Sequence, residues 1–186
     1  SGHKLYGPSG VGVLYMKDKW FDDFNPYQGG GDMIDKVEIN HTTFAKGFHK
    51  FEAGTPPIAQ VIGLGSSIDF INSLNLEKIY NHEKELYNSA LDKIYSFNDI
   101  SIYGKSLNKG VIISFNIKGV HANDLAMILD QKNIAIRTGH HCAQPLMKYL
   151  NINSSARASF GVYNDQNDID KFIESLSEAK KFFNLK

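Results

Sequence analysis

The sequence contains very little cysteine, with Cys142 as the single thiol among 186 residues. One thiol cannot form a disulfide within the chain. This excludes a disulfide-stabilised secreted domain and favours a reducing compartment, which we expect to be the cytoplasm or the interior of an organelle. The thiol itself is then either an inert core residue or a reactive group.

The sequence also lacks long hydrophobic runs and an excess of charge of either sign. No apolar segment approaches the roughly 20 residues that cross a bilayer, and 20 basic residues balance 20 acidic ones. We therefore expect no membrane partner and no nucleic-acid partner. With 42% hydrophobic and 22% charged residues, the composition is typical of a globular protein of one or two domains.

Glycine and turn residues dominate the first 55 positions. Between two turn signals, residues 11–15 form a short apolar run that predicts a strand, and residues 37–39 and 42–44 predict a small strand pair. A helix is expected over residues 57–74. It starts at a proline pair and is apolar on most sides, as a buried helix would be.

From Leu76 to Tyr95, apolar residues recur at helical spacing, which predicts a long amphipathic helix. After Phe97 the pattern changes to short strands and helices, which is typical of an α+β unit with a helix-covered sheet. We expect strands at residues 100–103, 111–115, 134–136 and 158–162, a helix at 124–131, and a terminal helix capped by Asn164 or Asp165.

The first candidate site is His3-Lys4, which follows Ser1-Gly2. A lysine beside a histidine is usually a solvated side chain. A turn of small residues, however, can bring backbone and a hydroxyl close to a phosphate and can fix a lysine amine beside the same ligand. A lysine that forms a Schiff base must be partly neutral, which burial or a cationic neighbour achieves.

The second candidate site surrounds Cys142, which directly follows two imidazoles, His140 and His141, and lies close to Arg137. Cationic neighbours increase the fraction of a thiol that is present as reactive thiolate. A polar loop is also a poor position for an inert buried cysteine. A zinc site is disfavoured, because adjacent residues rarely converge on one ion and no second ligand cluster completes it, so we expect no metal.

The third candidate is Arg157, which stands among small residues near the expected start of a strand. Its planar guanidinium can grip a carboxylate at two points. From the residues alone, a structural ion pair is an equally good interpretation.

Five motifs, in this order and at this spacing, resemble the group II cysteine desulfurases of the SufS type, which include selenocysteine lyase-like enzymes and are aminotransferase class V-like. They are residues 1–8, 29–34, 51–56, 137–143 and 157–159, and the resemblance covers the whole chain. It implies an α/β fold of the fold-type I transferases that use pyridoxal 5'-phosphate (PLP). It also implies that the chain is the C-terminal part of a longer protein.

The implied parts are the end of the large PLP-binding domain in residues 1–60, connecting helices in 61–97 and a small α+β C-terminal domain in 98–186. In the large domain, Lys4 would bind PLP as a Schiff base and later move the α-proton of the substrate. Ser1 and His3 would lie near the phosphate of PLP. Thr55 would reach the phosphate bound in the other subunit of a homodimer.

In the small domain, the resemblance assigns Arg157, assisted by Arg137, to the carboxylate of L-cysteine. Cys142 would attack the substrate sulfur, and His140 or His141 would aid proton transfer. The products would be L-alanine and a persulfide on Cys142. The tight loop implies transfer of that sulfur to an acceptor protein of the SufE or SufU type, for iron–sulfur cluster assembly.

Two other interpretations stay open. The protein is a selenocysteine lyase or another PLP enzyme on the same scaffold, or the chain is a non-catalytic scaffold or dimerisation module. The second interpretation rests on segments that this chain does not include. The resemblance places them before Lys4, where they would stack on the PLP ring and complete the phosphate site. We therefore expect the chain by itself to be inactive.

Overall fold

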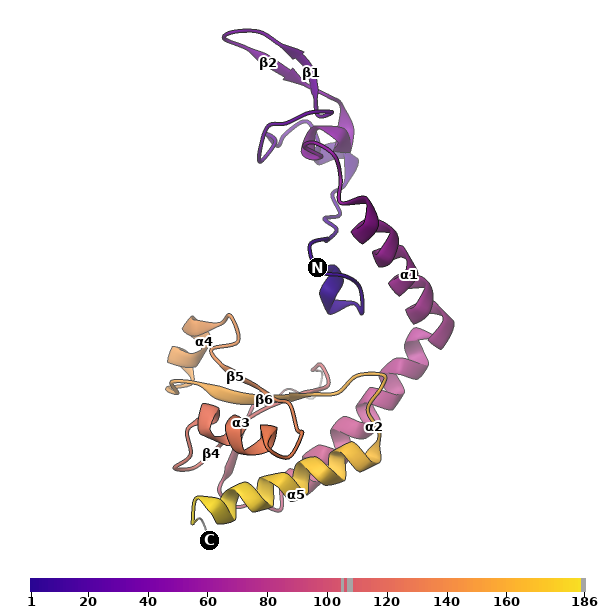
Figure 1. Ribbon diagram of the computed structural model, residues 1–186. Coiled ribbons are helices and arrows are strands. Elements are labelled where there is room, and N and C mark those ends of the chain that lie inside the picture. Colours follow the sequence, from indigo (N-terminus) through magenta and orange to yellow (C-terminus); the bar gives the residue numbers. More distant parts are fainter. Residues whose placement is uncertain (105, 107–108, 185–186) are drawn as a thin grey trace. The chain divides into compact units, whose positions relative to one another are not determined.

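The computed structural model describes residues 1–104, 106 and 109–184. The chain divides into two compact units, Ser1–Leu76 and Glu77–Lys186. The first unit holds a two-stranded antiparallel sheet of β1 (Ile34–Val37) and β2 (Thr42–Phe44), followed by helix α1 (Ile58–Leu74) (Figure 1). Short 3₁₀ helices lie at Gly2–Lys4, Asp18–Trp20 and Gly47–Phe51.

The strand pair of the first unit was predicted, although β1 begins and ends earlier than expected. The predicted strand at residues 11–15 is wrong, because the segment has no regular secondary structure. Val13, Leu14 and Tyr15 are 79%, 83% and 81% exposed. A strand needs a neighbour for its backbone hydrogen bonds, and no described strand pairs with this segment.

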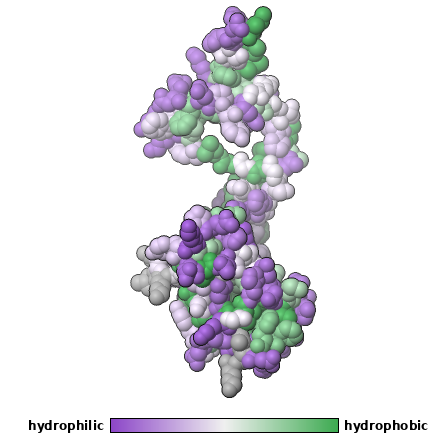
Figure 2. All heavy atoms as spheres, turned by 90° about the vertical axis from the view of Figure 1, so that its left-hand side faces the viewer, coloured by the Kyte–Doolittle hydropathy of each residue, from purple (hydrophilic) through white to green (hydrophobic). Residues whose placement is uncertain are grey.

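Helix α1 forms where it was predicted, but its predicted burial on most sides is wrong. Its buried residues are Leu64, Ser67 and Ile71, which lie three and four positions apart and so make one narrow stripe. Apolar side chains outside the stripe, such as Ile58 and Ile62, are exposed. Hydrophobic residues accordingly appear at the surface of this unit (Figure 2).

The second unit is built on a four-stranded antiparallel sheet in the order β3-β4-β6-β5. The strands are β3 (Ile100–Tyr103), β4 (Ile112–Ile117), β5 (Arg137–Gly139) and β6 (Ser155–Ser159). The helices are α2 (Leu76–Ile94), which begins at the boundary of the two units, α3 (Ala122–Asp130), α4 (Gln144–Tyr149) and α5 (Gln166–Phe182).

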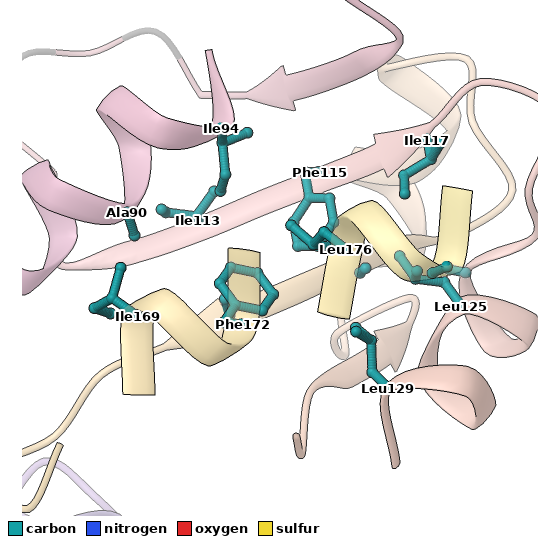
Figure 3. Close-up of a cluster of buried hydrophobic side chains, with 14 of the residues drawn as sticks. Ala90, Ile94, Ile113, Phe115, Ile117, Leu125, Leu129, Ile169, Phe172 and Leu176 are labelled. Atoms are coloured by element: carbon teal, nitrogen blue, oxygen red, sulfur yellow. The ribbon is translucent and has the colours of Figure 1, made fainter. Parts of the chain in front are cut away.

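The core of this unit lies between one face of the sheet and helices α2, α3 and α5. Alternate residues of β4, namely Ile113, Phe115 and Ile117, are buried on that face, as strand geometry requires. Figure 3 shows Phe115 pointing toward Phe172 and Leu176 of α5. The rings of Phe115 and Phe172 meet edge to face with centroids 6.1 Å apart.

Most elements of the second unit lie close to their predicted positions, and β3 matches in full. Asp165 caps α5 in a capping box with Asp168, so the second of the two predicted caps is the one used. The predicted strand at 134–136 is wrong: pairing with β6 begins at Arg137, while Ile134 and Ile136 pack against the core without strand pairing. Strand β6 also starts three residues before the predicted 158–162, and α4 was not predicted.

Candidate functional site

Lys4 lies in a tight turn that is held by backbone hydrogen bonds. The Gly2 N–H donates to the Val11 carbonyl at 2.8 Å, and the Gly2 carbonyl accepts from the Leu5 and Gly7 N–H groups at 2.9 and 3.0 Å. A Cβ added to Gly2 would lie 2.9 Å from Val11 Cγ1 and 3.0 Å from the Pro8 carbonyl oxygen. A side chain at this position would force Val11 and the Pro8 carbonyl to shift, which explains the glycine beside His3-Lys4.

The lysine turn is seated on helix α1. A Cβ at Gly7 would lie 3.0 Å from Ser67 Oγ and 3.2 Å from Leu64 Cδ1, two of the buried side chains of the helix. The rings of Tyr6 and Phe70 also meet edge to face, with centroids 6.2 Å apart. The narrow buried stripe of α1 is thus the surface that fixes the lysine turn.

The groups that this turn presents suit the cofactor implied by the resemblance. Lys4, His3 and Ser1 are exposed, while the Gly2 between them is buried. An exposed amine on a fixed backbone is free to bond covalently to a carbonyl, and the imidazole and hydroxyl beside it suit a phosphate. The residues present therefore fit PLP.

Thr55 lies beside the glycine run, although the two are more than twenty residues apart in the sequence. The Gly54 N–H donates to the Gly31 carbonyl at 2.9 Å, and a Cβ at Gly30 would lie 3.1 Å from Ala53 Cβ. Thr55 itself is exposed next to this contact. Two of the motifs that carry the resemblance therefore meet in the first unit.

Cys142 lies in a tight turn between β5 and α4. His141 and Cys142 have φ angles of 53° and 59°, and the Ala143 N–H donates to the His140 carbonyl at 2.9 Å. Positive φ at both central residues and this hydrogen bond are features of a type I′ turn, which usually contains Asn or Gly. A left-handed conformation costs a non-glycine residue roughly 1–2 kcal/mol, so surrounding contacts must hold this turn.

Two guanidinium groups belong to the same part of the second unit as the thiol. Arg137 Nη2 lies 3.5 Å from Cys142 Sγ, within hydrogen-bond range for sulfur. Arg137 of β5 stands directly opposite Arg157 of β6 in the sheet register. Arg157 Nε is buried and has no hydrogen-bond partner in the described part of the chain. An orphaned guanidinium N–H beside a second guanidinium fits a carboxylate ligand.

His141 is held by the neighbouring strand. Its Nε2 lies 2.9 Å from the Ser155 carbonyl oxygen and 3.1 Å from Ser155 Oγ. Because a carbonyl oxygen only accepts, Nε2 carries the proton and donates it. Burial lowers the pKa of His141, and the charges of Arg157 and Arg137 lower it further, against the opposing effect of the Ser155 bond. His140, in contrast, is exposed.

An open depression of about 600 Å³ lies over this turn. Its lining includes Arg137, Thr138, His140, His141 and Cys142. Cys142 is exposed, so the thiol can meet a molecule that enters. The second unit therefore presents a nucleophile with the Arg137 guanidinium beside it in a space large enough for an amino acid.

The structure brings together five of the predicted site residues in the second unit, namely Arg137, His140, His141, Cys142 and Arg157. Lys4, His3, Ser1 and Thr55 belong to the first unit.

Sequence reasoning missed Ser155 and the bond from Thr138 Oγ1 to Asn123 Oδ1, at 2.7 Å. Only the register of β5 and β6 reveals Ser155, because it sets this residue opposite Gly139.

Residues 1–104, 106 and 109–184 offer no metal centre, since they contain no group of three or more His, Cys, Asp or Glu side chains that could hold an ion. Nor does this part of the chain contain a helix with the length and apolarity that crossing a membrane requires.

Curated proteins similar to this chain are named as cysteine desulfurases. The chain is 45% identical over 184 residues to a probable cysteine desulfurase of Staphylococcus epidermidis (strain ATCC 12228 / FDA PCI 1200). It is 46% identical over 183 residues to a cysteine desulfurase of Wigglesworthia glossinidia brevipalpis. These alignments cover 98% of this chain but 45% and 44% of the relatives, so the chain spans less than half of their length.

Solved structures show the same fold. The cysteine desulfurase CsdA of Escherichia coli, in an S-sulfonic acid form, matches with a TM-score of 0.92 at 33% identity, over 98% of this chain and 45% of that one. The apo cysteine desulfurase of Thermococcus onnurineus NA1 matches with a TM-score of 0.91 at 37% identity, over 98% and 46%. The predicted fold class, the α/β fold of the fold-type I PLP enzymes, is confirmed.

The family of this chain follows from how much of its length one protein family matches. The Aminotransferase class-V family matches residues 1–172, which includes the lysine turn, the glycine run, the thiol turn and both arginines of the sheet. The chain therefore belongs to the aminotransferase class-V family.

Proposed function

We propose that the protein, in its complete form, is a PLP-dependent cysteine desulfurase that converts L-cysteine to L-alanine and keeps the sulfur as a persulfide on Cys142. The observation that carries this proposal is the contact between Arg137 Nη2 and Cys142 Sγ, at 3.5 Å. It sets a nucleophilic sulfur beside a cationic group at an accessible position. The names of the relatives support the same activity.

The two arginines are proposed to bind the carboxylate of the substrate. Their positions opposite one another on β5 and β6, and the orphaned Nε of Arg157, favour an anion between them. A carboxylate held there would hold the rest of the amino acid close to the thiol turn, since L-cysteine is small. Such positioning is a large part of catalysis by a residue set of this kind.

Lys4 is proposed to hold PLP through its amine and later to carry the α-proton of the substrate on Nζ. Bound PLP would supply an electron sink for the bonds at the α-carbon. His3 and Ser1 would contact its phosphate. Thr55 would contact the phosphate of a second subunit, which makes the homodimer part of the proposal.

The sulfur transfer itself needs a thiolate at Cys142. Its Sγ attacks the sulfur of L-cysteine, an S–S bond forms, and the C–S bond breaks with its electron pair left on the carbon side. Protonation of that carbon and return of a proton from Lys4 Nζ to the α-carbon complete L-alanine, and the sulfur remains on Cys142. His140 or His141 is proposed to aid the proton transfers, since an imidazole titrates near neutral pH.

The remaining details are part of the same proposal. We infer a group II, SufS-type enzyme of the cytoplasm or an organelle, which passes its sulfur to an acceptor protein of the SufE or SufU type for iron–sulfur cluster assembly. The short turn at Cys142 supports this inference, because a nucleophile fixed close to its strand needs a partner that comes to it. Turnover of L-cysteine against L-selenocysteine distinguishes this activity from that of a selenocysteine lyase.

The experiment that tests the proposal compares Cys142→Ser with the unchanged complete protein loaded with PLP. The variant is expected to keep the visible absorbance of lysine-bound PLP and to lose sulfide release from L-cysteine in the presence of a reductant. A Lys4→Ala variant is expected to lose both the absorbance and the activity. Undiminished sulfide release by Cys142→Ser would exclude the role proposed for the thiol.

A further inference from the structure

We propose that His141 is a positioning residue: its Nε2–H bond to Ser155 on β6 holds the left-handed turn that keeps the Cys142 thiol beside the Arg137 guanidinium. This inference rests on the proposed function and deepens it, because it explains how the thiol is held in place. It assigns a role to Ser155, which sequence reasoning did not single out.

The first observation is the backbone of the turn. Two consecutive non-glycine residues, His141 and Cys142, have φ angles of 53° and 59°. Within the turn, the Ala143 N–H bond to the His140 carbonyl is compatible with this conformation. Glycine or asparagine would form the turn with less strain. The presence of histidine indicates that its side chain compensates for the strain through a contact outside the turn.

The second observation is where the His141 side chain goes. Its Nε2 lies 2.9 Å from the carbonyl oxygen and 3.1 Å from Oγ of Ser155. Ser155 is only 1% exposed and pairs with Gly139, the last residue of β5 before the turn. The imidazole therefore connects the middle of the turn to the strand beside which the turn begins.

The third observation concerns the other ring nitrogen. His141 Nδ1 is buried and has no hydrogen-bond partner among the residues that the structure describes. Protonating it would place a charge in a buried position near Arg137 and Arg157, which is unfavourable. The lowered pKa of His141 agrees with this geometry. With one nitrogen bonded and the other buried, His141 is poorly suited to carry protons, and this leaves the exposed His140 for that role.

The bond has a direct consequence for the thiol. Cys142 follows His141 in the turn, so the position of Sγ depends on where the imidazole is held. Arg137 Nη2 lies 3.5 Å from Sγ, and the backbone of Arg137 is paired with β6 rather than being part of the turn. Loss of the bond to Ser155 would therefore separate the thiol from the Arg137 guanidinium.

The test measures how strongly the thiol prefers a negatively charged reagent. Cys142 is the one cysteine of the chain, so carboxymethylation by iodoacetate and carbamidomethylation by iodoacetamide both report on it. The ratio of the two rate constants, measured on the 186-residue chain without PLP at about pH 8, reflects the guanidinium charges beside the sulfur. An imidazole is mostly neutral at that pH.

His141→Asn retains a residue that accepts a positive φ, but its side chain is too short to reach Ser155. We expect this variant to lower the ratio by about threefold or more at low ionic strength. His141→Gln places an amide N–H near the position of Nε2 and is expected to restore most of the ratio. His41→Asn, which removes an exposed imidazole of the first unit, is expected to leave the ratio unchanged. A ratio in His141→Asn equal to that of the unchanged protein would overturn the proposal.

A second measurement needs no variant. The ¹⁵N shifts of the imidazole in the unchanged protein are expected to show the Nε2–H tautomer of His141 at neutral pH, and a Nδ1–H tautomer would contradict the proposed bond. Neither measurement involves cofactor or substrate. A failed desulfurase assay would therefore not change the result of either measurement, and a negative result in these measurements would leave the desulfurase proposal standing.

Discussion

Arg137 and Arg157 stand directly opposite one another on the adjacent antiparallel strands β5 and β6. Like charges in this position repel and destabilise a sheet by up to about 1 kcal/mol unless an anion lies between them. The Nε of Arg157, buried without a partner among the described residues, adds a donor to the same place. The repulsion between Arg137 and Arg157 is therefore unfavourable in the free sheet, and a bound anion would turn it into a favourable interaction.

Small carboxylates should therefore stabilise the second unit. We expect acetate or L-alanine to raise the unfolding temperature of the chain, because a ligand that binds only the folded state stabilises it by about 1.4 kcal/mol at ten times its dissociation constant. Differential scanning fluorimetry at constant ionic strength measures this shift. Arg157→Gln should remove it, and Lys148→Gln, which changes an exposed lysine of α4, should retain it. An equal shift in all three proteins would argue against a carboxylate between the arginines.

The lowered pKa of His141 predicts how stability depends on pH. The folded state disfavours the charged imidazole, whereas the unfolded state has a pKa of about 6.5. Below about pH 6.5 the unfolded chain therefore binds more protons than the folded chain. The contribution of the neutral imidazole to the free energy of unfolding is complete above about pH 6.5 and declines as the pH falls below it. Urea denaturation at about pH 7.5 and 5.5 should show a larger loss in the unchanged protein than in His141→Gln. Equal losses in the two proteins would contradict a lowered pKa for this imidazole.

The core between the sheet and α5 should depend strongly on Phe115, which is fully buried against Phe172. Phe115→Ala is expected to lower the free energy of unfolding by about 3–5 kcal/mol, through lost burial and the cavity that remains. Phe182→Ala is a matched control, because this ring at the end of α5 is 66% exposed. It should change the free energy of unfolding by less than about 0.5 kcal/mol. Equilibrium urea denaturation distinguishes the two.

The lysine turn should not tolerate a side chain at Gly2. A Cβ there would lie 2.9 Å from Val11 Cγ1 and 3.0 Å from the Pro8 carbonyl oxygen, so Gly2→Ala is expected to destabilise the first unit by about 1–3 kcal/mol. Gly12→Ala serves as the control, since its Cβ would find only ordinary contact, 3.5 Å from Ser1 Cα. Thermal unfolding of both variants measures the difference. Equal stability would mean that the turn can move away from the added methyl group.

Local patterns were enough to predict helices α2, α3 and α5 and strands β3 and β4 of the second unit. Helix α5 shows why: a capping box at Asp165 and an apolar stripe through Ile169, Phe172 and Leu176 are both visible in the sequence. Strand β5 shows the limit. Its pairing begins at Arg137, a polar residue, because the sheet register and not hydrophobicity decides where the strand starts.

The first unit was harder to predict, because many of its apolar side chains are exposed and not buried in a core. Residues 12–15 and much of α1 have the composition of buried elements and yet are exposed. Among the site residues, cysteine, lysine and arginine were predicted from their chemistry and motifs. Ser155 was not, because a serine in a strand carries no local signal of the side chain that will be folded onto it.

The left-handed backbone at Cys142 has a consequence for chemical synthesis. A φ near +59° is natural for a D-amino acid, so D-cysteine at this position would fit the turn with less strain than the native residue. Its Cβ would leave the backbone in a different direction and carry the sulfur away from Arg137. A chain assembled by ligation at Cys142 with D-cysteine would thus be more stable than the native chain, and its thiol would be less reactive. Comparing the two chains would separate the free-energy cost of the left-handed turn from the effect of the turn on the thiol.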